Sequence, residues 1–327
     1  MGSGPLLSGP RLVVGFDGPT LPAEVVGLAR RGALAGVCLF DRNIEDAEGL
    51  RALVREVHGL FPSDLPPIVA VDQEGGLVQR LKPPKLPDVA RVAPMREAAA
   101  GGVAGLEALG EAMGADLLRY GVNVDLAPVL DVDSNPDNPV IGSRAFARTA
   151  AEVAALGLAF ARGLARAGVA ACGKHFPGHG DTASDSHLTL PVVAHDAARL
   201  DRVELAPFAA AVEAGLPLIM TAHVVYPALD ADWPATLSPR VVPDVLRGRL
   251  GYDGVVVSDD LDMAAIKGRF DVATIARGLA AADVDLALVC RDLAFAEALA
   301  EHLGPSARAA ARVTRLRRGL ARGAGAV

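Results

Sequence analysis

Eight short apolar runs recur along the chain, and an amphipathic stretch of helical length follows each of them. Fully apolar strands separated by helices are typical of a parallel sheet that is covered on both faces. Eight such units fit a closed (β/α)8 barrel better than an open, doubly wound sheet. The predicted strands span residues 12–16, 36–40, 67–71, 122–126, 169–172, 216–221, 254–257 and 285–289. We therefore predict an α/β protein with a TIM-type (β/α)8 barrel.

The predicted helices lie between these strands, at residues 22–31, 47–60, 103–120, 149–167, 197–214, 239–250, 272–282 and 293–303. A last helix, at residues 306–322, would close the chain. No linker rich in proline, glycine or serine interrupts this pattern. We expect a single domain over residues 1–327, a length that suits one barrel of this type.

Composition and charge exclude several classes of function. The net charge is −7 with acids and bases interspersed, so we expect no nucleic-acid partner. No apolar run reaches the ~18 residues of a membrane helix, and the N-terminus lacks the features of a signal peptide. We expect a cytoplasmic protein without a membrane partner, and a monomer. Three cysteines, Cys38, Cys172 and Cys290, lie in apolar runs and are expected to be buried thiols.

Polar residues come at or just after the end of each predicted strand. They are Asp17, Arg42, Asn43, Asp72, Gln73, Glu74, Asp125, Asp131, Lys174, His175, His223, Asp259, Asp260, Cys290 and Arg291. In a barrel of this type the chemistry takes place at the carboxyl ends of the strands. We therefore expect these scattered residues to meet at one rim of the barrel.

The densest polar stretch spans residues 173–191 and contains three histidines, two aspartates and Lys174. It has neither helical nor strand periodicity, and proline and glycine punctuate it, so we predict a functional loop. Histidine and aspartate at short spacings are metal-ligand types. Equally, Asp185 could orient His187 for acid–base work. Spacing alone does not decide between these two interpretations.

The segments Lys174-His-Phe-Pro-Gly-His-Gly-Asp-Thr182 and Asp185-Ser-His187 resemble the signature loop of family 3 glycoside hydrolases. The resemblance is strongest to the bacterial β-N-acetylhexosaminidase branch of that family. It implies that Asp185 and His187 form the acid/base dyad and that neither a metal nor another cofactor is used. Many members carry a second sandwich domain, which we do not expect here.

Two further stretches are similar to sugar-binding segments of the family. Val71-Asp-Gln-Glu-Gly-Gly-Leu-Val-Gln-Arg80 implies that Asp72 and Arg80 bind substrate, although Leu77 replaces the family's usual arginine. Residues 138–146 imply a binding role for Arg144. Within the signature loop, Lys174 and His175 match the pair that holds the sugar hydroxyls. We expect Asp131 to organise the neighbouring loop, whereas His223 could equally be a structural residue.

Ser258-Asp-Asp-Leu-Asp-Met263 resembles the family segment whose first aspartate is the nucleophile, which is Asp259 here. A nucleophilic carboxylate must stay ionised at a fixed point, and the end of a rigid strand provides that. Asp260 would support it, and Asp262 is expected to be solvated.

The resemblance thus implies a retaining β-N-acetylglucosaminidase that acts on cell-wall fragments containing N-acetylglucosamine. A phosphorylase with the same dyad is one alternative, because such a dyad puts no free carboxylate in the path of an anionic acceptor. A sugar-binding barrel without activity and a metal-dependent hydrolase are two others.

Overall fold

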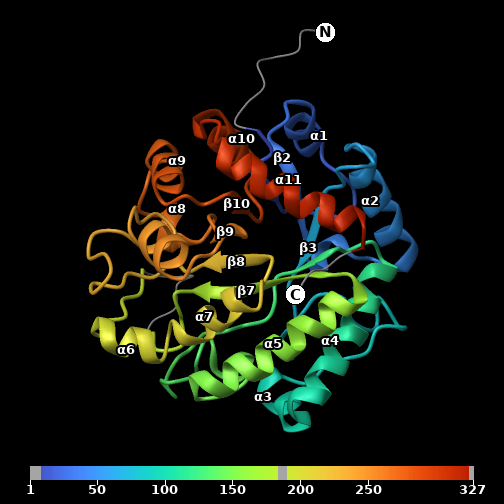
Figure 1. Ribbon diagram of the computed structural model, residues 1–327. Coiled ribbons are helices and arrows are strands. Elements are labelled where there is room, and N and C mark those ends of the chain that lie inside the picture. The colour runs from blue at the N-terminus through green and yellow to red at the C-terminus, as the bar shows by residue number, and fades with distance from the viewer. Residues whose placement is uncertain (1–8, 183–189, 324–327) are drawn as a thin grey trace.

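The computed structural model describes residues 9–182 and 190–323 and contains a closed barrel of eight parallel strands (Figure 1). Neighbouring strands follow the order β1-β10-β9-β8-β7-β6-β3-β2. Their bounds are Leu12–Val14 (β1), Leu34–Leu39 (β2), Ile68–Val71 (β3), Val124–Asp125 (β6), Ala170–Phe176 (β7), Leu218–Thr221 (β8), Val255–Asp260 (β9) and Leu286–Val289 (β10). The predicted (β/α)8 barrel is confirmed.

Helices cover the outside of the barrel (Figure 1). The longer ones are Ala23–Arg30 (α1), Ala47–Gly59 (α2), Gly102–Arg119 (α4), Ala150–Ala167 (α5), Ala206–Glu213 (α7), Val272–Ala281 (α9), Leu293–His302 (α10) and Ala307–Ala321 (α11). Short helices are Met95–Ala98 (α3), Ala197–Arg202 (α6) and Ala264–Lys267 (α8), with 3-10 turns at Asp41–Asn43 (η1), Ala99–Gly101 (η2) and Gly142–Arg144 (η3). None of the described helices is long and apolar enough to cross a membrane.

The core has two layers, because successive strand residues point to opposite sides. Alternate residues such as Val13, Cys38 and Cys172 fill the inside of the barrel. The others, such as Val14 and Val37, pack against the surrounding helices. All three cysteines are buried and free, as predicted.

Two predicted helices differ from those observed. The segment 197–214 forms two helices, α6 and α7, instead of one. Pro207 lies in the first turn of α7, where its missing N–H costs no helical hydrogen bond. The segment 239–250 forms a π-helix, Val241–Arg249 (η4), which contains Pro243. Pro243 is the third residue of η4, where a missing N–H again costs no helical hydrogen bond.

The loop predicted at 173–191 begins later than expected, because β7 continues as far as Phe176. Every residue of this strand is buried, including Lys174 and His175. A second unpredicted element is the antiparallel hairpin that follows β3. Its strands are Gln73–Gly75 (β4) and Val78–Gln79 (β5). Both elements carry side chains to the carboxyl end of the barrel.

Candidate active site

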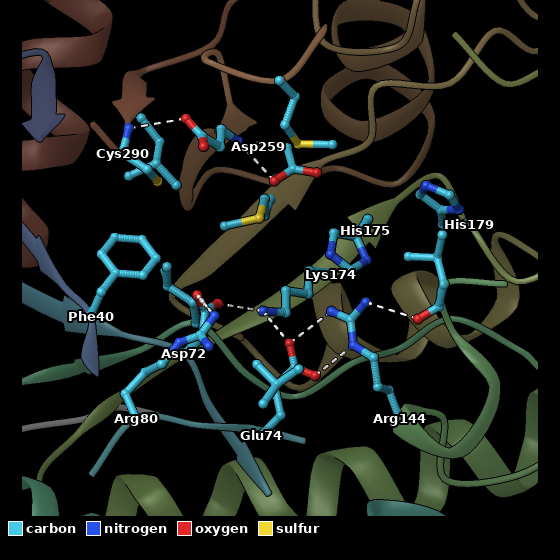
Figure 2. Close-up of a pocket in the computed structure, with 17 residues that line it drawn as sticks. Phe40, Asp72, Glu74, Arg80, Arg144, Lys174, His175, His179, Asp259 and Cys290 are labelled. Atoms are coloured by element: carbon cyan, nitrogen blue, oxygen red, sulfur yellow. Dashed lines mark hydrogen bonds and ion pairs between the residues drawn. The ribbon is translucent and has the colours of Figure 1, made fainter. Parts of the chain in front are cut away.

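A pocket of about 200 Å³ opens at the carboxyl ends of the strands (Figure 2). We call it the inner pocket. The residues that the sequence predicted for substrate binding and nucleophilic attack all line it, namely Asp72, Arg80, Arg144, Lys174, His175 and Asp259. Asp72 and Arg80 come directly after β3 and β5, and the other four belong to η3, β7 and β9. The volume lies below the ~300–1,000 Å³ of sites for drug-sized ligands, which suits one sugar ring.

Lys174 is the buried cation of the inner pocket. Its Nζ lies 2.8 Å from Asp72 Oδ1 and 2.6 Å from Glu74 Oε1, and its side chain is only 2% exposed. Burial lowers the pKa of Lys174, but the two carboxylates outweigh burial and raise the pKa above its usual value. The lysine therefore stays charged although it is inside the protein.

Glu74 holds Lys174 and Arg144 together. Arg144 donates from Nε to Glu74 Oε2 and from Nη2 to Oε1, both at 2.8 Å (Figure 2). This two-fold geometry is the strong form of an arginine–carboxylate pair. Burial raises the pKa of Glu74, but the charges of Lys174 and Arg144 lower it well below its usual value. The sequence analysis assigned no role to Glu74, although it lies within the family-like segment 71–80.

The hairpin places Arg80 beside Asp72. Gln73 is buried, and its Oε1 accepts hydrogen bonds from the backbone N–H groups of Arg80 and Leu81, both at 3.0 Å. The backbone N–H of Gln73 in turn donates to Asp125 Oδ1 at 3.0 Å. Arg80 Nη2 then lies 3.5 Å from Asp72 Oδ2. The Gln73 side chain thus positions a sugar-binding candidate without lining the pocket.

Asp131 organises the start of the signature loop, as predicted. Its Oδ2 lies 2.7 Å from His175 Nδ1, and its Oδ1 accepts the backbone N–H groups of His175 (3.1 Å) and His179 (2.6 Å). Burial raises the pKa of Asp131, but His175 outweighs burial and lowers it. His179 also lines the inner pocket, which the sequence analysis missed. Burial and the charge of His175 lower its pKa to about 4.

Asp259 is the penultimate residue of β9 and lies on the side of the inner pocket opposite Glu74 and Arg144 (Figure 2). Its Oδ1 accepts the backbone N–H of Asp260 at 2.8 Å. Burial raises the pKa of Asp259, but the charges of His223 and His175 outweigh burial and lower it. The carboxylate is therefore ionised at neutral pH, as a nucleophile must be.

Asp260 fixes the turn after β9. Its Oδ1 accepts the backbone N–H groups of Asp262 and Cys290, each at 3.0 Å, which agrees with the predicted supporting role. Asp262 was expected to be solvated, and that expectation is wrong. Its Oδ2 accepts the N–H groups of Arg291 (2.8 Å) and Asp292 (3.0 Å), so it joins the loops after β9 and β10.

His223 is fully buried beside the site. Its Nδ1 lies 2.8 Å from Thr236 Oγ1, and its Nε2 lies 3.0 Å from the carbonyl oxygen of Asp260. These contacts favour the structural interpretation of this residue. Its charge nevertheless contributes to the lowered pKa of Asp259.

Asp185 and His187, the predicted dyad, lie outside the described residues. Asp181 precedes them in the sequence, and its Oδ1 accepts a hydrogen bond from Ser134 Oγ at 3.2 Å. His195 follows them in the sequence, and its Nε2 contacts the other oxygen of Asp181. Across residues 9–182 and 190–323, no group of three or more His, Cys, Asp or Glu side chains could hold a metal ion.

The family model described as the glycosyl hydrolase family 3 N-terminal domain matches residues 20–318 of this chain. The chain belongs to glycosyl hydrolase family 3. A relative from Methylococcus capsulatus, named beta-hexosaminidase, is 43% identical over 279 residues, which cover 84% of this chain and 81% of the relative. The chain is thus a glycoside hydrolase, and the sequence-based assignment is confirmed.

Two solved structures are similar to this chain over almost its whole length. A beta-N-acetylglucosaminidase from Paenibacillus sp. FPU-7 superposes with a TM-score of 0.89 at 37% identity. The match covers 96% of this chain, but this chain spans only 62% of that protein. NagZ from Neisseria gonorrhoeae, solved with N-trifluoroacetyl-D-glucosamine, superposes with a TM-score of 0.82 at 30% identity. That match covers 97% of this chain and 100% of NagZ.

Proposed function

We propose that this family 3 enzyme is a retaining β-N-acetylglucosaminidase that removes terminal β-linked N-acetylglucosamine from muropeptide fragments of peptidoglycan. The main support for this proposal is an ionised carboxylate, Asp259, that faces a set of paired charges across a pocket sized for one sugar ring. The names of the relatives support the choice of sugar, since they are called beta-hexosaminidase or beta-N-acetylglucosaminidase. NagZ was solved with an N-acylated glucosamine.

The paired charges suit the recognition of sugar hydroxyls. Asp72 and Lys174 contact each other, yet each keeps capacity for further hydrogen bonds, because a carboxylate offers about four acceptor sites and an ammonium three donors. Hydrogen bonds from hydroxyls to such charged groups are stronger than neutral ones. In our proposal Asp72, Arg80, Arg144, Lys174 and His175 bind the sugar through these remaining sites.

The proposed chemistry has two steps and needs no cofactor. In the first, an Asp259 oxygen attacks the anomeric carbon, the bond to the leaving oxygen breaks, and that oxygen takes a proton from His187. In the second, His187 removes a proton from water, and the water oxygen displaces Asp259 from the anomeric carbon. Asp185 orients His187 and stabilises its charged form. A histidine suits both roles, because its pKa lies near neutrality.

Analysis of the first-formed product tests this proposal. With a 4-nitrophenyl N-acetyl-β-glucosaminide, NMR should detect the β-anomer of N-acetylglucosamine before mutarotation. Release of the α-anomer first would contradict a double displacement. The same reaction with added phosphate should still yield free N-acetylglucosamine, whereas a sugar 1-phosphate would instead identify a phosphorylase.

A further inference from the structure

A second, larger hollow adjoins the inner pocket at the rim of the barrel. It has a volume of about 730 Å³, and Phe40, Asp260, Met263 and Cys290 line both hollows. We call this second hollow the outer groove. Figure 2 shows Phe40 and Cys290 together on one side of the inner pocket. Because these four residues line both, the two hollows lie side by side, and the outer groove is the neighbouring space for a group attached to a sugar in the inner pocket.

Two guanidinium groups of the outer groove share one carboxylate. Arg42 Nε lies 2.8 Å from Asp17 Oδ1, and Arg291 Nε lies 3.4 Å from the same oxygen. Burial lowers the pKa of Arg42, and the charge of Arg291 lowers it further, as expected for like charges held together. This edge of the groove therefore carries one positive charge that Asp17 does not neutralise.

Arg42 is less accessible to a ligand than Arg291, because its side chain is only 24% exposed. Its Nε also donates to the carbonyl oxygen of Phe16 at 3.0 Å, and its Nη2 donates to that of Cys290. Arg291 differs, because its side chain is 67% exposed. Among the residues that the structure describes, its guanidinium contacts Asp17 alone. Arg291 thus offers most of its five N–H donors to the groove.

The carboxylates of the outer groove are already engaged. Asp260 and Asp262 each accept two backbone N–H groups. Asp292 accepts the N–H of Phe295 at 2.9 Å and the ammonium of Lys267 at 2.6 Å. Lys267 also bonds to Asp262 at 3.0 Å. The three acids and Lys267 thus form hydrogen bonds with one another or with the backbone. Among the charged groups that line the groove, Arg291 keeps the most N–H donors for a ligand.

We propose that the outer groove holds the aglycone of the substrate and that Arg291 selects aglycones that carry a carboxylate. The inference rests on the proposed function, because it assumes that a glycoside occupies the inner pocket. The attraction is modest, since Arg291 is exposed and water screens its charge. Arg291 is therefore a specificity residue for the leaving portion of the substrate and takes no part in bond cleavage.

A matched pair of substrates tests the role of Arg291. One is an N-acetyl-β-glucosaminide whose aglycone bears a lactyl carboxylate, and the other is its methyl ester. We expect the wild-type enzyme to prefer the acid over the ester in kcat/KM by about fivefold at low salt, the size expected for an exposed ion pair. Arg291→Gln should abolish that preference but leave the ester and 4-nitrophenyl N-acetyl-β-glucosaminide unaffected. The control Arg308→Gln, at an exposed position of α11, should change neither the acid-to-ester ratio nor kcat/KM for the aryl substrate.

Asp17→Asn gives a test in the opposite direction. This variant removes the carboxylate that competes for Arg291, so the preference for the acid should rise. A purely structural role for these residues would not produce that gain. Suppose that the wild type hydrolyses 4-nitrophenyl N-acetyl-β-glucosaminide. An equal kcat/KM for acid and ester, or an unchanged acid-to-ester ratio in Arg291→Gln, would then overturn the inference about Arg291 but not the proposed function. Failure to hydrolyse this aryl substrate overturns the proposed function and the inference with it.

Discussion

At the scale of single residues, the rim of the barrel depends on carboxylates whose structural roles are not evident from the sequence. Glu74 is the counter-ion of Lys174 and Arg144, and Asp262 joins two loops through backbone N–H groups. A glutamate or aspartate next to other polar residues is normally solvent-exposed. Residue type alone therefore predicts that Glu74 and Asp262 are exposed and have no structural role. Their positions within family-like segments were the available signal.

Glu74→Gln should keep the shape of the side chain but remove the charge that orders two cations. We expect kcat/KM for an aryl N-acetylglucosaminide to fall by about a hundredfold or more, mainly through KM, because Lys174 and Arg144 lose their shared partner. A matched control is Glu107→Gln, which removes the carboxylate that pairs with Arg162 and Arg166 between α4 and α5. The control should stay within about twofold of wild type. Equal losses in both variants would remove Glu74 from the site.

Asp260 should make stability depend on pH. Burial raises its pKa to about 6, whereas an unfolded aspartate has a pKa of about 3.9. Between these values the folded protein binds more protons than the unfolded chain, so this group's contribution to stability is lost as pH rises. Asp260→Asn removes the effect and retains Oδ1, the oxygen that accepts both backbone N–H groups.

Relative to Asp260→Asn, the wild type should lose roughly 2–3 kcal/mol of unfolding free energy between pH 4 and pH 7.5. Urea unfolding of both proteins across that range measures the difference. Parallel pH profiles for the two proteins would show that Asp260 has an ordinary pKa.

At the scale of secondary-structure elements, the sequence predicted the barrel because its strands are apolar and its helices are amphipathic. The prediction ended β7 too early, since Lys174 and His175 are polar residues whose burial depends on Asp72, Glu74 and Asp131, which lie far away in the sequence. Periodicity reports only local burial, so long-range pairing of this kind is invisible to it. The hairpin of β4 and β5 was missed for another reason, because strands of three and two residues are too short to show an alternating pattern.

Helices α4 and α5 pack closely at a pair of glycines. A Cβ added at Gly163 would overlap the backbone carbonyl oxygen of Glu107, and one at Gly110 would overlap that of Phe160. Gly163→Ala should therefore destabilise the protein by about 1–3 kcal/mol in urea unfolding, because the helices must move apart. Gly105→Ala is the control, in the same helix as Gly110 but with open space around it. It should be neutral or stabilising by up to ~1 kcal/mol. Similar effects of the two changes would contradict a close helix contact.

At the scale of the whole molecule, Asp285 joins elements from distant parts of the sequence at the start of β10. Its Oδ2 accepts from Arg247 of η4 (2.7 Å) and the N–H of Val256 (2.8 Å), and its Oδ1 accepts from Arg312 of α11 (2.8 Å). The carboxylate is fully buried. This network ties the last helix to the barrel, on strands whose opposite ends carry the inner pocket.

Asp285→Ala should cost about 3–5 kcal/mol of unfolding free energy, because two arginines lose a buried partner. The KM of the remaining folded enzyme should not change, since the network lies away from the inner pocket. Asp201→Ala, which breaks the exposed pair with Arg249, should cost less than ~1 kcal/mol. A raised KM in Asp285→Ala would show that this network also shapes the site.

The most direct test of the account is to identify the residue that becomes covalently bonded to the sugar. A 5-fluoro N-acetylglucosaminyl fluoride, which slows the second step, should accumulate a glycosyl-enzyme that intact-mass spectrometry detects. Peptide mapping should place the sugar on Asp259, and the label should persist in Asp260→Asn but vanish in Asp259→Asn. A label on any other residue, or its retention in Asp259→Asn, would contradict the assignment of Asp259 as the nucleophile.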